Sequence, residues 1–227
     1  MQKKMKNEKI LLKDNPIKDK IKNWAIKWLS ELKAYKYYIF ISVIIITFST
    51  FINEIAGYYV TYSAPMTQVP DLILDAIGPW DWSFSFVYVN LGIFFITFLY
   101  PIIFEVAKIH KVLIQFALLS ITRSCFVIMT HLQTPLDAIP VKYPSIFNAM
   151  AFTNDSFFSG HTAFPFLMFL VLKGKKIRWL FLAASIYMGI TVLVTHRHYS
   201  IDVFAAYFIT YSSYKIGEWI MAKTTKH

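Results

Sequence analysis

Residues 195–203 read Thr-His-Arg-His-Tyr-Ser-Ile-Asp-Val and separate two long apolar segments, residues 179–195 and 199–221. His198 and Asp202 lie four residues apart, a spacing that places both side chains on one face of a helix. A carboxylate in that position can hold the proton of one imidazole nitrogen and leave the other nitrogen free as nucleophile or base. Titratable groups at the mouth of an apolar helix are costly, so this stretch is a candidate site.

The rest of the chain repeats this alternation of long apolar blocks and short polar stretches. Of its 227 residues, 56% are hydrophobic, and several blocks approach the roughly 20 residues that cross a bilayer. We therefore predict an all-α polytopic membrane protein with six transmembrane helices. The expected spans are residues 37–60, 84–107, 112–134, 157–172, 179–195 and 199–221.

The charged residues predict the orientation of these spans. The formal net charge is +10, and 11 of the 23 Lys and Arg residues fall within residues 1–36. Further basic turns follow at residues 108–111 and 173–178, on the same predicted side as both termini. This asymmetry is typical of cytoplasmic termini and argues against nucleic acid as the partner. The candidate site then faces the non-cytoplasmic side.

The predicted domain organisation is a catalytic membrane domain between two basic tails. The first tail, residues 1–36, contains an apolar stretch at residues 21–32 that suits an interfacial helix. The membrane domain covers residues 37–221, and residues 222–227 form the second tail. The single cysteine, Cys125, leaves no pair for an intrachain disulfide and no cysteine zinc site.

A second polar stretch opens the predicted fourth span. Ser159-Gly160-His161-Thr162 combines a helix-capping serine with a glycine that permits close backbone approach. A helix start favours an anion such as phosphate, and we expect Pro165 in the first turn, where its missing N–H costs nothing. The alternative is a capped helix whose histidine merely lies at the membrane interface.

Arg123 is the third candidate, because it lies inside the predicted third span. An isolated arginine there costs several kcal/mol, so it faces a polar cavity or a partner. Its guanidinium matches phosphate oxygens in shape. The alternative is a structural ion pair with Glu54 or Glu105. Thr130 and His131, one to two turns further on, can extend a polar stripe towards the outer surface.

Together these residues fit phosphoryl transfer through histidine. That chemistry needs an imidazole nucleophile held by a carboxylate, a second imidazole that protonates the leaving oxygen, and fixed positive charge. His198, Asp202, His161 and Arg123 can fill these roles in that order. Acid–base chemistry explains the cluster without a metal or other cofactor, and we expect neither.

The motifs resemble those of the type 2 phosphatidic acid phosphatase superfamily of lipid phosphatases and phosphotransferases. Ser-Gly-His at residues 159–161 is followed some forty residues later by His198 and Asp202. Asp155 and the stretch 196–203 are more narrowly similar to the sphingomyelin synthase branch, as is the region 123–132. The Lys-x6-Arg-Pro motif of other members is missing, as is the Ser-Arg before the second histidine, and Ser200 stands where that branch usually has threonine.

The resemblance implies a transferase with a phosphohistidine intermediate. A phospholipid would donate a phosphocholine- or phosphoethanolamine-like headgroup to a lipid alcohol such as ceramide, releasing diacylglycerol. The resemblance further implies that Ser159, Gly160 and Thr162 join Arg123 at the phosphate. The expected headgroup or supporting residues are Asp155, His196, Arg197, Tyr199 and His131.

Two alternatives stay open from the sequence. Water as the acceptor would make the protein a lipid phosphate phosphatase or a phospholipase C-like hydrolase. A non-catalytic lipid-binding membrane protein is the alternative from another class. The sequence indicates a bilayer and lipid substrates as partners, and leaves the oligomeric state open.

Overall fold

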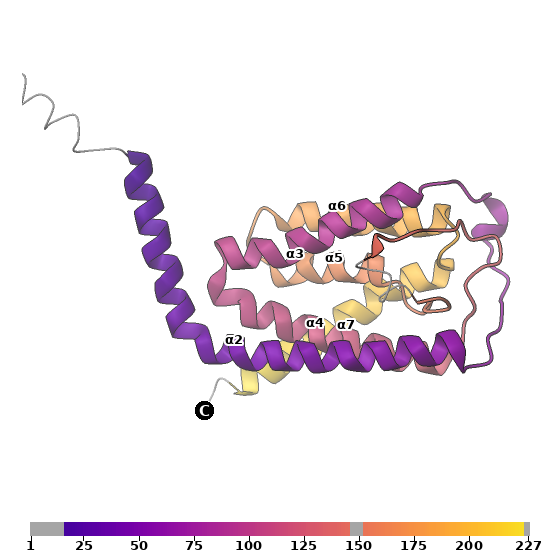
Figure 1. Ribbon diagram of the computed structural model, residues 1–227, viewed down its shortest axis with the longest axis horizontal. Coiled ribbons are helices and arrows are strands. Elements are labelled where there is room, and N and C mark those ends of the chain that lie inside the picture. The colour runs from indigo at the N-terminus through magenta and orange to yellow at the C-terminus, as the bar shows by residue number, and fades with distance from the viewer. Residues whose placement is uncertain (1–15, 146–151, 225–227) are drawn as a thin grey trace, which may run out of the picture.

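The computed structural model describes residues 16–145 and 152–224, and its regular elements are helices (Figure 1). They are α2 (Pro16–Tyr62), η1 (Leu74–Ala76), η2 (Ser85–Val89), α3 (Asn90–Phe104), η3 (Val106–Lys108), α4 (Ile109–Thr130), α5 (Gly160–Val171), α6 (Arg178–Val194) and α7 (Ser200–Thr224). Within the described residues, strand pairing is limited to an isolated bridge between Thr67 and Leu132. The predicted all-α class is confirmed. Residues 1–15 and 225–227 of the two predicted tails lie outside the described residues.

Helix α2 is 47 residues long and joins the predicted interfacial helix to the predicted first span without a break. Figure 1 shows that it bends, so that its first part stands away from the bundle and its second part runs along it. The first part is tied to the end of α3. Trp24 Nε1 donates to the carbonyl of Ile103 at 3.2 Å, and Trp28 Nε1 donates to that of Ile102 at 2.8 Å. These bonds satisfy carbonyls that a helix end leaves without partners.

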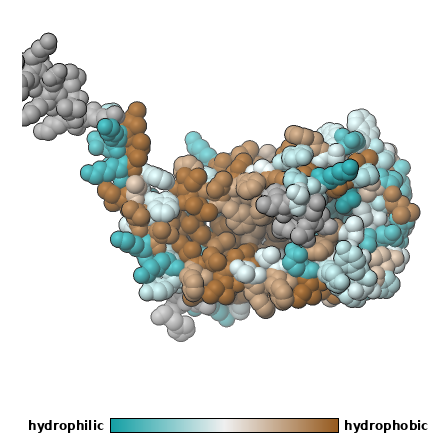
Figure 2. Space-filling view, in the orientation of Figure 1, coloured by the Kyte–Doolittle hydropathy of each residue, from teal (hydrophilic) through white to brown (hydrophobic). Residues whose placement is uncertain are grey.

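Three helical stretches are long and apolar enough to cross a membrane: Pro16–Tyr62, Ser85–Phe104 and Val106–Thr130. Two shorter apolar helices, Gly160–Val171 and Arg178–Val194, accompany them, so the count of six spans stays a prediction. Figure 2 shows hydrophobic side chains over the middle of the molecule and hydrophilic ones at its right-hand end. An exposed apolar belt of this kind suits lipid and supports a membrane environment.

The apolar core lies around α5, which packs against α6 and α7 and also contacts α3 and α4. Phe158, just before α5, is fully buried, as are Leu167 and Met168 within it and Leu119 on α4. Close packing of this kind resists displacement. The first turn of α5, which carries the predicted Ser-Gly-His motif, is therefore held in a fixed position.

Loops gather at one end of the bundle, which we call the loop end: residues 63–84, 131–145, 152–159 and 195–199 (Figure 1). Backbone hydrogen bonds connect them. Trp80 donates to the carbonyl of Val194 at 2.8 Å, and Ile139 donates to that of Thr195 at 2.9 Å. Thr67 adds two further bonds, from its N–H to His131 at 3.1 Å and from Gln133 to its carbonyl at 3.0 Å. The end of α6 and the two outer loops thus form one hydrogen-bonded unit.

The basic turns lie at the opposite end of the bundle. Glu105, between α3 and η3, pairs with Lys108 at 3.3 Å and also with Lys175 from the turn after α5. The Arg178 guanidinium lies 4.0 Å from the centre of the Phe169 ring. The basic turns and the loops of the candidate site thus lie at opposite ends of the bundle, as the sequence predicted. The orientation of those ends in a membrane stays a prediction.

Cysteine labelling will test this orientation. The exposed native Cys125 is first replaced by alanine. We then expect Asp137→Cys, at a loop-end side chain that is 58% exposed, to react with a membrane-impermeant thiol reagent applied to intact cells. Lys175→Cys, at a side chain that is 42% exposed on the opposite end, will react only after the cells are opened, because Lys and Arg favour the cytoplasmic side. The reverse labelling pattern would refute cytoplasmic termini.

Candidate functional site

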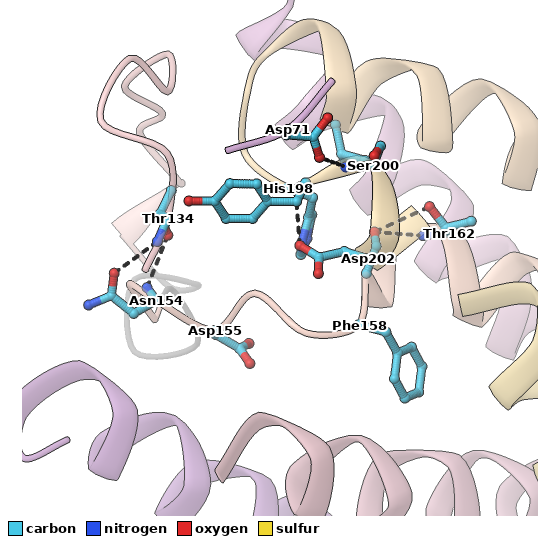
Figure 3. Close-up of polar contacts among 12 residues, drawn as sticks. Asp71, Thr134, Asn154, Asp155, Phe158, Thr162, His198, Ser200 and Asp202 are labelled. Atoms are coloured by element: carbon cyan, nitrogen blue, oxygen red, sulfur yellow. Dashed lines mark hydrogen bonds and ion pairs between the residues drawn. The ribbon is translucent and has the colours of Figure 1, made fainter. Parts of the chain in front are cut away.

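His198 and Asp202 meet at the loop end, in the turn that leads into α7. His198 Nδ1 lies 3.2 Å from Asp202 Oδ2, and the exposed fractions are 4% for His198 and 0% for Asp202 (Figure 3). The same carboxylate oxygen accepts the backbone N–H of Tyr199 at 3.0 Å. Asp202 thus reaches back over the start of its own helix, as the third residue of a capping box does. Its second oxygen, Oδ1, is buried and has no hydrogen-bond partner among the described residues.

The surroundings of His198 favour an uncharged imidazole. Burial lowers the pKa of His198 to about 3, and the charges of Arg123 and Arg197 act in the same direction. Asp155 and a hydrogen bond with the backbone of Ser156 oppose this shift without reversing it. An imidazole that is neutral at physiological pH keeps a lone pair available, as a nucleophile requires.

His161 faces His198 from the first turn of α5. The ring centroids are 6.0 Å apart, and the His161 ring also packs on Phe86 with centroids 4.3 Å apart. The turn is fixed by Ser159, whose hydroxyl accepts from the N–H of Thr162 at 3.4 Å and from its hydroxyl at 3.2 Å. The predicted serine cap is therefore present. The backbone N–H of Ser159 in turn donates to the carbonyl of Asp202 at 3.2 Å, which joins the two motifs directly.

In α5, Gly160 permits the close approach expected from the sequence, whereas Pro165 does not lie in the first turn. A Cβ on Gly160 would lie 3.3 Å from Arg123 Nε and 3.3 Å from the Phe164 ring, so the glycine allows the arginine to approach α5. Pro165 lies at the sixth residue of α5, beyond the first turn, so that part of the prediction is wrong. Its missing N–H is the one that would otherwise bond the carbonyl of His161.

Arg123 is bound to the segment that precedes α5. Its Nε donates to the carbonyl of Phe158 at 2.8 Å, and its NH2 donates to that of Asp155 at 2.9 Å. Its NH1 pairs with both carboxylate oxygens of Asp155, at 2.8 and 2.9 Å. The ion-pair partner is therefore Asp155, and not Glu54 or Glu105. Most of the guanidinium donors are used within the protein.

The segment 152–158 is itself anchored to the neighbouring loop. Thr134 donates its N–H to the side chain of Asn154, and Asn154 donates its N–H to the hydroxyl of Thr134, each at 3.1 Å (Figure 3). Asn154 adopts a left-handed conformation, with φ of 61°. The reciprocal bonds hold Asp155 beside Arg123 and bring the segment against His198.

The remaining predicted residues differ in whether they contact the groups around His161 and His198. His196 is 2% exposed, and both of its ring nitrogens are engaged, Nδ1 with Asp137 at 2.8 Å and Nε2 with the carbonyl of Ile77 at 2.9 Å. Tyr199 is buried beside Asp202. His131 lies against Tyr59, with its Nε2 3.3 Å from the phenol oxygen. His196 and His131 therefore tie loops together, and their described contacts do not involve His161 or His198.

Arg197 is the predicted residue with the least engaged side chain. Its guanidinium lies 5.6 Å from the centre of the Phe86 ring. Its Nε is buried without a hydrogen-bond partner in the described part of the chain. Burial raises the pKa of Tyr143 to about 12, and the charge of Arg197 opposes this rise. Arg197 therefore lies in the same cluster as Phe86 and Tyr143, next to the two histidines.

Phe86, Tyr143 and Asp71 belong to the site but were not predicted from the sequence. Asp71 Oδ1 accepts from the N–H groups of Ile73 and Leu74, and its Oδ2 accepts from that of Ser200 at 2.6 Å (Figure 3). The spacing of Asp71 before η1 is a recognisable turn signal. Its bond to Ser200 spans 129 residues, and no local signal reports such a contact.

Asp71→Asn will lower stability, because the amide presents one acceptor oxygen where the carboxylate presents two. Burial alone would raise the pKa of Asp71, but hydrogen bonds from Leu74, Ser200 and Ile73 lower it below the ordinary 3.8. Its contribution is therefore present above the ordinary pKa and is lost as the pH falls through the lowered value. We expect a loss of about 1–3 kcal/mol at pH 7, measured by thermal unfolding in detergent. Asp75→Asn, at a nearby exposed aspartate, is the control. Equal melting temperatures for the two variants would contradict this role.

A cavity of about 440 Å³ opens beside the site at the loop end. Residues 68–79 form one wall, residues 135–137 form another, and Tyr199 closes it towards α7. The residues that line it do not include either of the paired histidines. Over the described ranges, no group of three or more His, Cys, Asp or Glu residues is arranged to hold a metal ion.

Comparison with known proteins finds a family model that matches the part of the chain carrying both histidines. Residues 153–218 match the family model described as PAP2 superfamily C-terminal, a stretch that contains the motifs around His161 and His198. None of the curated proteins and none of the solved structures matches the chain. The match supports the type 2 phosphatidic acid phosphatase superfamily. With the apolar helices, it supports a membrane enzyme of the lipid phosphatase or phosphotransferase type.

Proposed function

We propose that the protein is an integral-membrane phosphotransferase that moves a phospholipid headgroup to a lipid alcohol through a phosphohistidine. The observation that carries this proposal is the pair of facing imidazoles of His161 and His198, whose ring centroids are 6.0 Å apart and of which His198 is held by Asp202. The match to the phosphatase superfamily and the exposed apolar helices support a lipid substrate. The donor headgroup is phosphocholine or a phosphoethanolamine-like group, and the acceptor is an alcohol such as ceramide.

In the first step, His198 attacks the phosphorus of the donor. The Nδ1–H group of His198 keeps its hydrogen bond to Asp202, and Nε2 forms the new P–N bond. The P–O bond to diacylglycerol breaks, and the departing oxygen takes a proton from protonated His161. The hydrogen bond between His198 and the backbone of Ser156 gives way to the substrate in this step.

In the second step, the acceptor replaces diacylglycerol. His161, now neutral, takes the proton of the acceptor hydroxyl, whose oxygen attacks phosphorus. A P–O bond forms, the P–N bond breaks, and His198 returns to its neutral form. In the first turn of α5, the backbone N–H groups of Gly160 and His161 suit the phosphoryl oxygens. Those of Ser159 and Thr162 already donate to the Asp202 carbonyl and to the Ser159 hydroxyl. Arg123 lies against Gly160 and holds the segment before α5 in place through its bonds to Asp155 and Phe158.

A product assay tests this function. Purified protein in vesicles receives headgroup-labelled phosphatidylcholine or phosphatidylethanolamine, with and without ceramide. The proposal expects label in a new sphingophospholipid and release of diacylglycerol, both dependent on ceramide. Label that stays entirely in the donor under all conditions would contradict it.

Hydrolysis is the second candidate function, and the superfamily match favours it as much as it favours transfer. Here water takes the place of the alcohol in the second step, with the same residues in the same roles. Its products are diacylglycerol and free headgroup phosphate whether or not ceramide is present. The same assay therefore separates the two functions by where the label appears.

A further inference from the structure

Two guanidinium groups, those of Arg123 and Arg197, border the site. The donors of Arg123 are already bound to other groups of the protein. Arg123 makes three sets of contacts, to the carboxylate of Asp155, to the carbonyl of Asp155 and to that of Phe158. The side chains are 8% and 23% exposed for Arg123 and Asp155, so the ion pair is largely shielded from water. In formal charge the pair is neutral.

The second guanidinium, that of Arg197, is partly buried but is not paired with any acidic residue of the described ranges. It directly precedes His198 in the chain, and no hydrogen bond or ion pair to it is found within residues 16–145 and 152–224. Its contact is the Phe86 ring at 5.6 Å, and that ring packs on His161. The charge of Arg197 also contributes to the lowered pKa of His198, after burial and Arg123. Arg197 is therefore the free cationic donor beside both histidines.

We propose that Asp155 makes this site selective for singly charged phosphodiesters over doubly charged phosphomonoesters. By neutralising Arg123, the carboxylate leaves Arg197 as the uncompensated guanidinium. A diester needs one positive partner, whereas a monoester needs two and finds the second guanidinium already paired with Asp155. The proposal rests on the proposed function, since it assumes that the phosphoryl group binds between the histidines, and it names the substrate class of that site.

Two small probes isolate the charge. Phenyl phosphate is close to a dianion at pH 8, because the second pKa of such monoesters is near 6. Its methyl ester, methyl phenyl phosphate, is nearly the same shape and carries a single charge. Binding of each to the purified full chain is measured by ³¹P NMR titration and by the rise in melting temperature. Neither readout requires turnover.

The wild-type protein is expected to bind the monoanion more tightly than the dianion. Asp155→Asn keeps an acceptor for Arg123 but removes the charge, and it is expected to shift the ratio of the two dissociation constants at least about tenfold towards the dianion. Asp81→Asn removes the same formal charge from an exposed loop-end position that does not line the cavity and is expected to leave the ratio unchanged. Arg197→Gln is expected to weaken binding of both probes at least about tenfold.

Each outcome decides the proposal. An unchanged ratio in a folded Asp155→Asn protein would overturn it, as would equal shifts in the Asp155 and Asp81 variants. If Asp155→Asn does not fold, Asp155→Ser takes its place with the same expectation, because it too removes the charge and keeps a hydrogen-bonding oxygen. Selective binding without any lipid turnover would leave this inference standing and refute the proposed function, whereas turnover with an unchanged ratio would do the reverse.

Discussion

His198→Ala is expected to abolish lipid turnover, with a loss of at least about 1,000-fold in kcat. The physical reason is that the imidazole of His198 forms the covalent bond to phosphorus. Without it, no phosphohistidine forms and the headgroup cannot be passed to an acceptor. The assay follows headgroup-labelled phosphatidylcholine in vesicles. A second readout is acid-labile label on the protein itself, which the wild type should show after rapid denaturation and the variant should lack.

The control for this experiment is the other histidine of the same turn. His196→Asn keeps a polar side chain and alters a residue whose ring nitrogens are bound to Asp137 and Ile77 rather than facing the second histidine. We expect it to lower the melting temperature but to retain label on the protein. If His198→Ala kept labelled protein and His196→Asn lost it, the nucleophile would be assigned to the wrong residue.

His161→Ala is expected to lose about 100- to 10,000-fold in kcat with a phospholipid donor, the range typical of removing a general acid. The loss should depend on the leaving group. Diacylglycerol leaves as a strongly basic alkoxide and needs the proton, whereas p-nitrophenolate leaves readily without one. With p-nitrophenyl phosphocholine as donor, the first step should therefore be nearly as fast in the variant as in the wild type.

This comparison separates an acid from a merely structural histidine. Phe86, which packs on the His161 ring at 4.3 Å, offers the control. Phe86→Leu should also slow the phospholipid donor more than the p-nitrophenyl donor, but by a smaller factor than His161→Ala, because it displaces the ring without removing its proton. Equal losses for both donors in His161→Ala would refute the role of His161 as general acid.

The helices and the pairing of His198 with Asp202 could be predicted from the sequence for the same reason. Both depend on local periodicity, since apolar block length identifies helices and a spacing of four brings two side chains together. The serine cap of α5 is local in the same sense. Features of this kind are present in a short window of the chain and survive folding unchanged.

The partner of Arg123 could not be chosen from the sequence, because the choice depends on how loops return to the bundle. The sequence suggested Glu54 or Glu105, whereas the partner in the structure, Asp155, is 32 residues away in a segment without regular structure. The contacts of Asp71 with Ser200 and of Phe86 with His161 are equally remote in sequence. Pro165 was wrongly assigned to the first turn, because the correctly predicted cap at Ser159 already makes it the sixth residue of the helix, beyond a turn of 3.6 residues.

The hydrogen bonds that join the outer loops to the end of α6 run between main-chain atoms. Main-chain pairing is indifferent to the identity of the side chain that each residue bears, except at proline. Apart from Asp71 and Asp137, whose side chains bond to Ser200 and His196, the residues of the cavity walls can therefore change their side chains while the main-chain frame keeps its geometry. A scaffold built in this way offers those loop positions as sites where the shape and charge of the cavity can be redesigned.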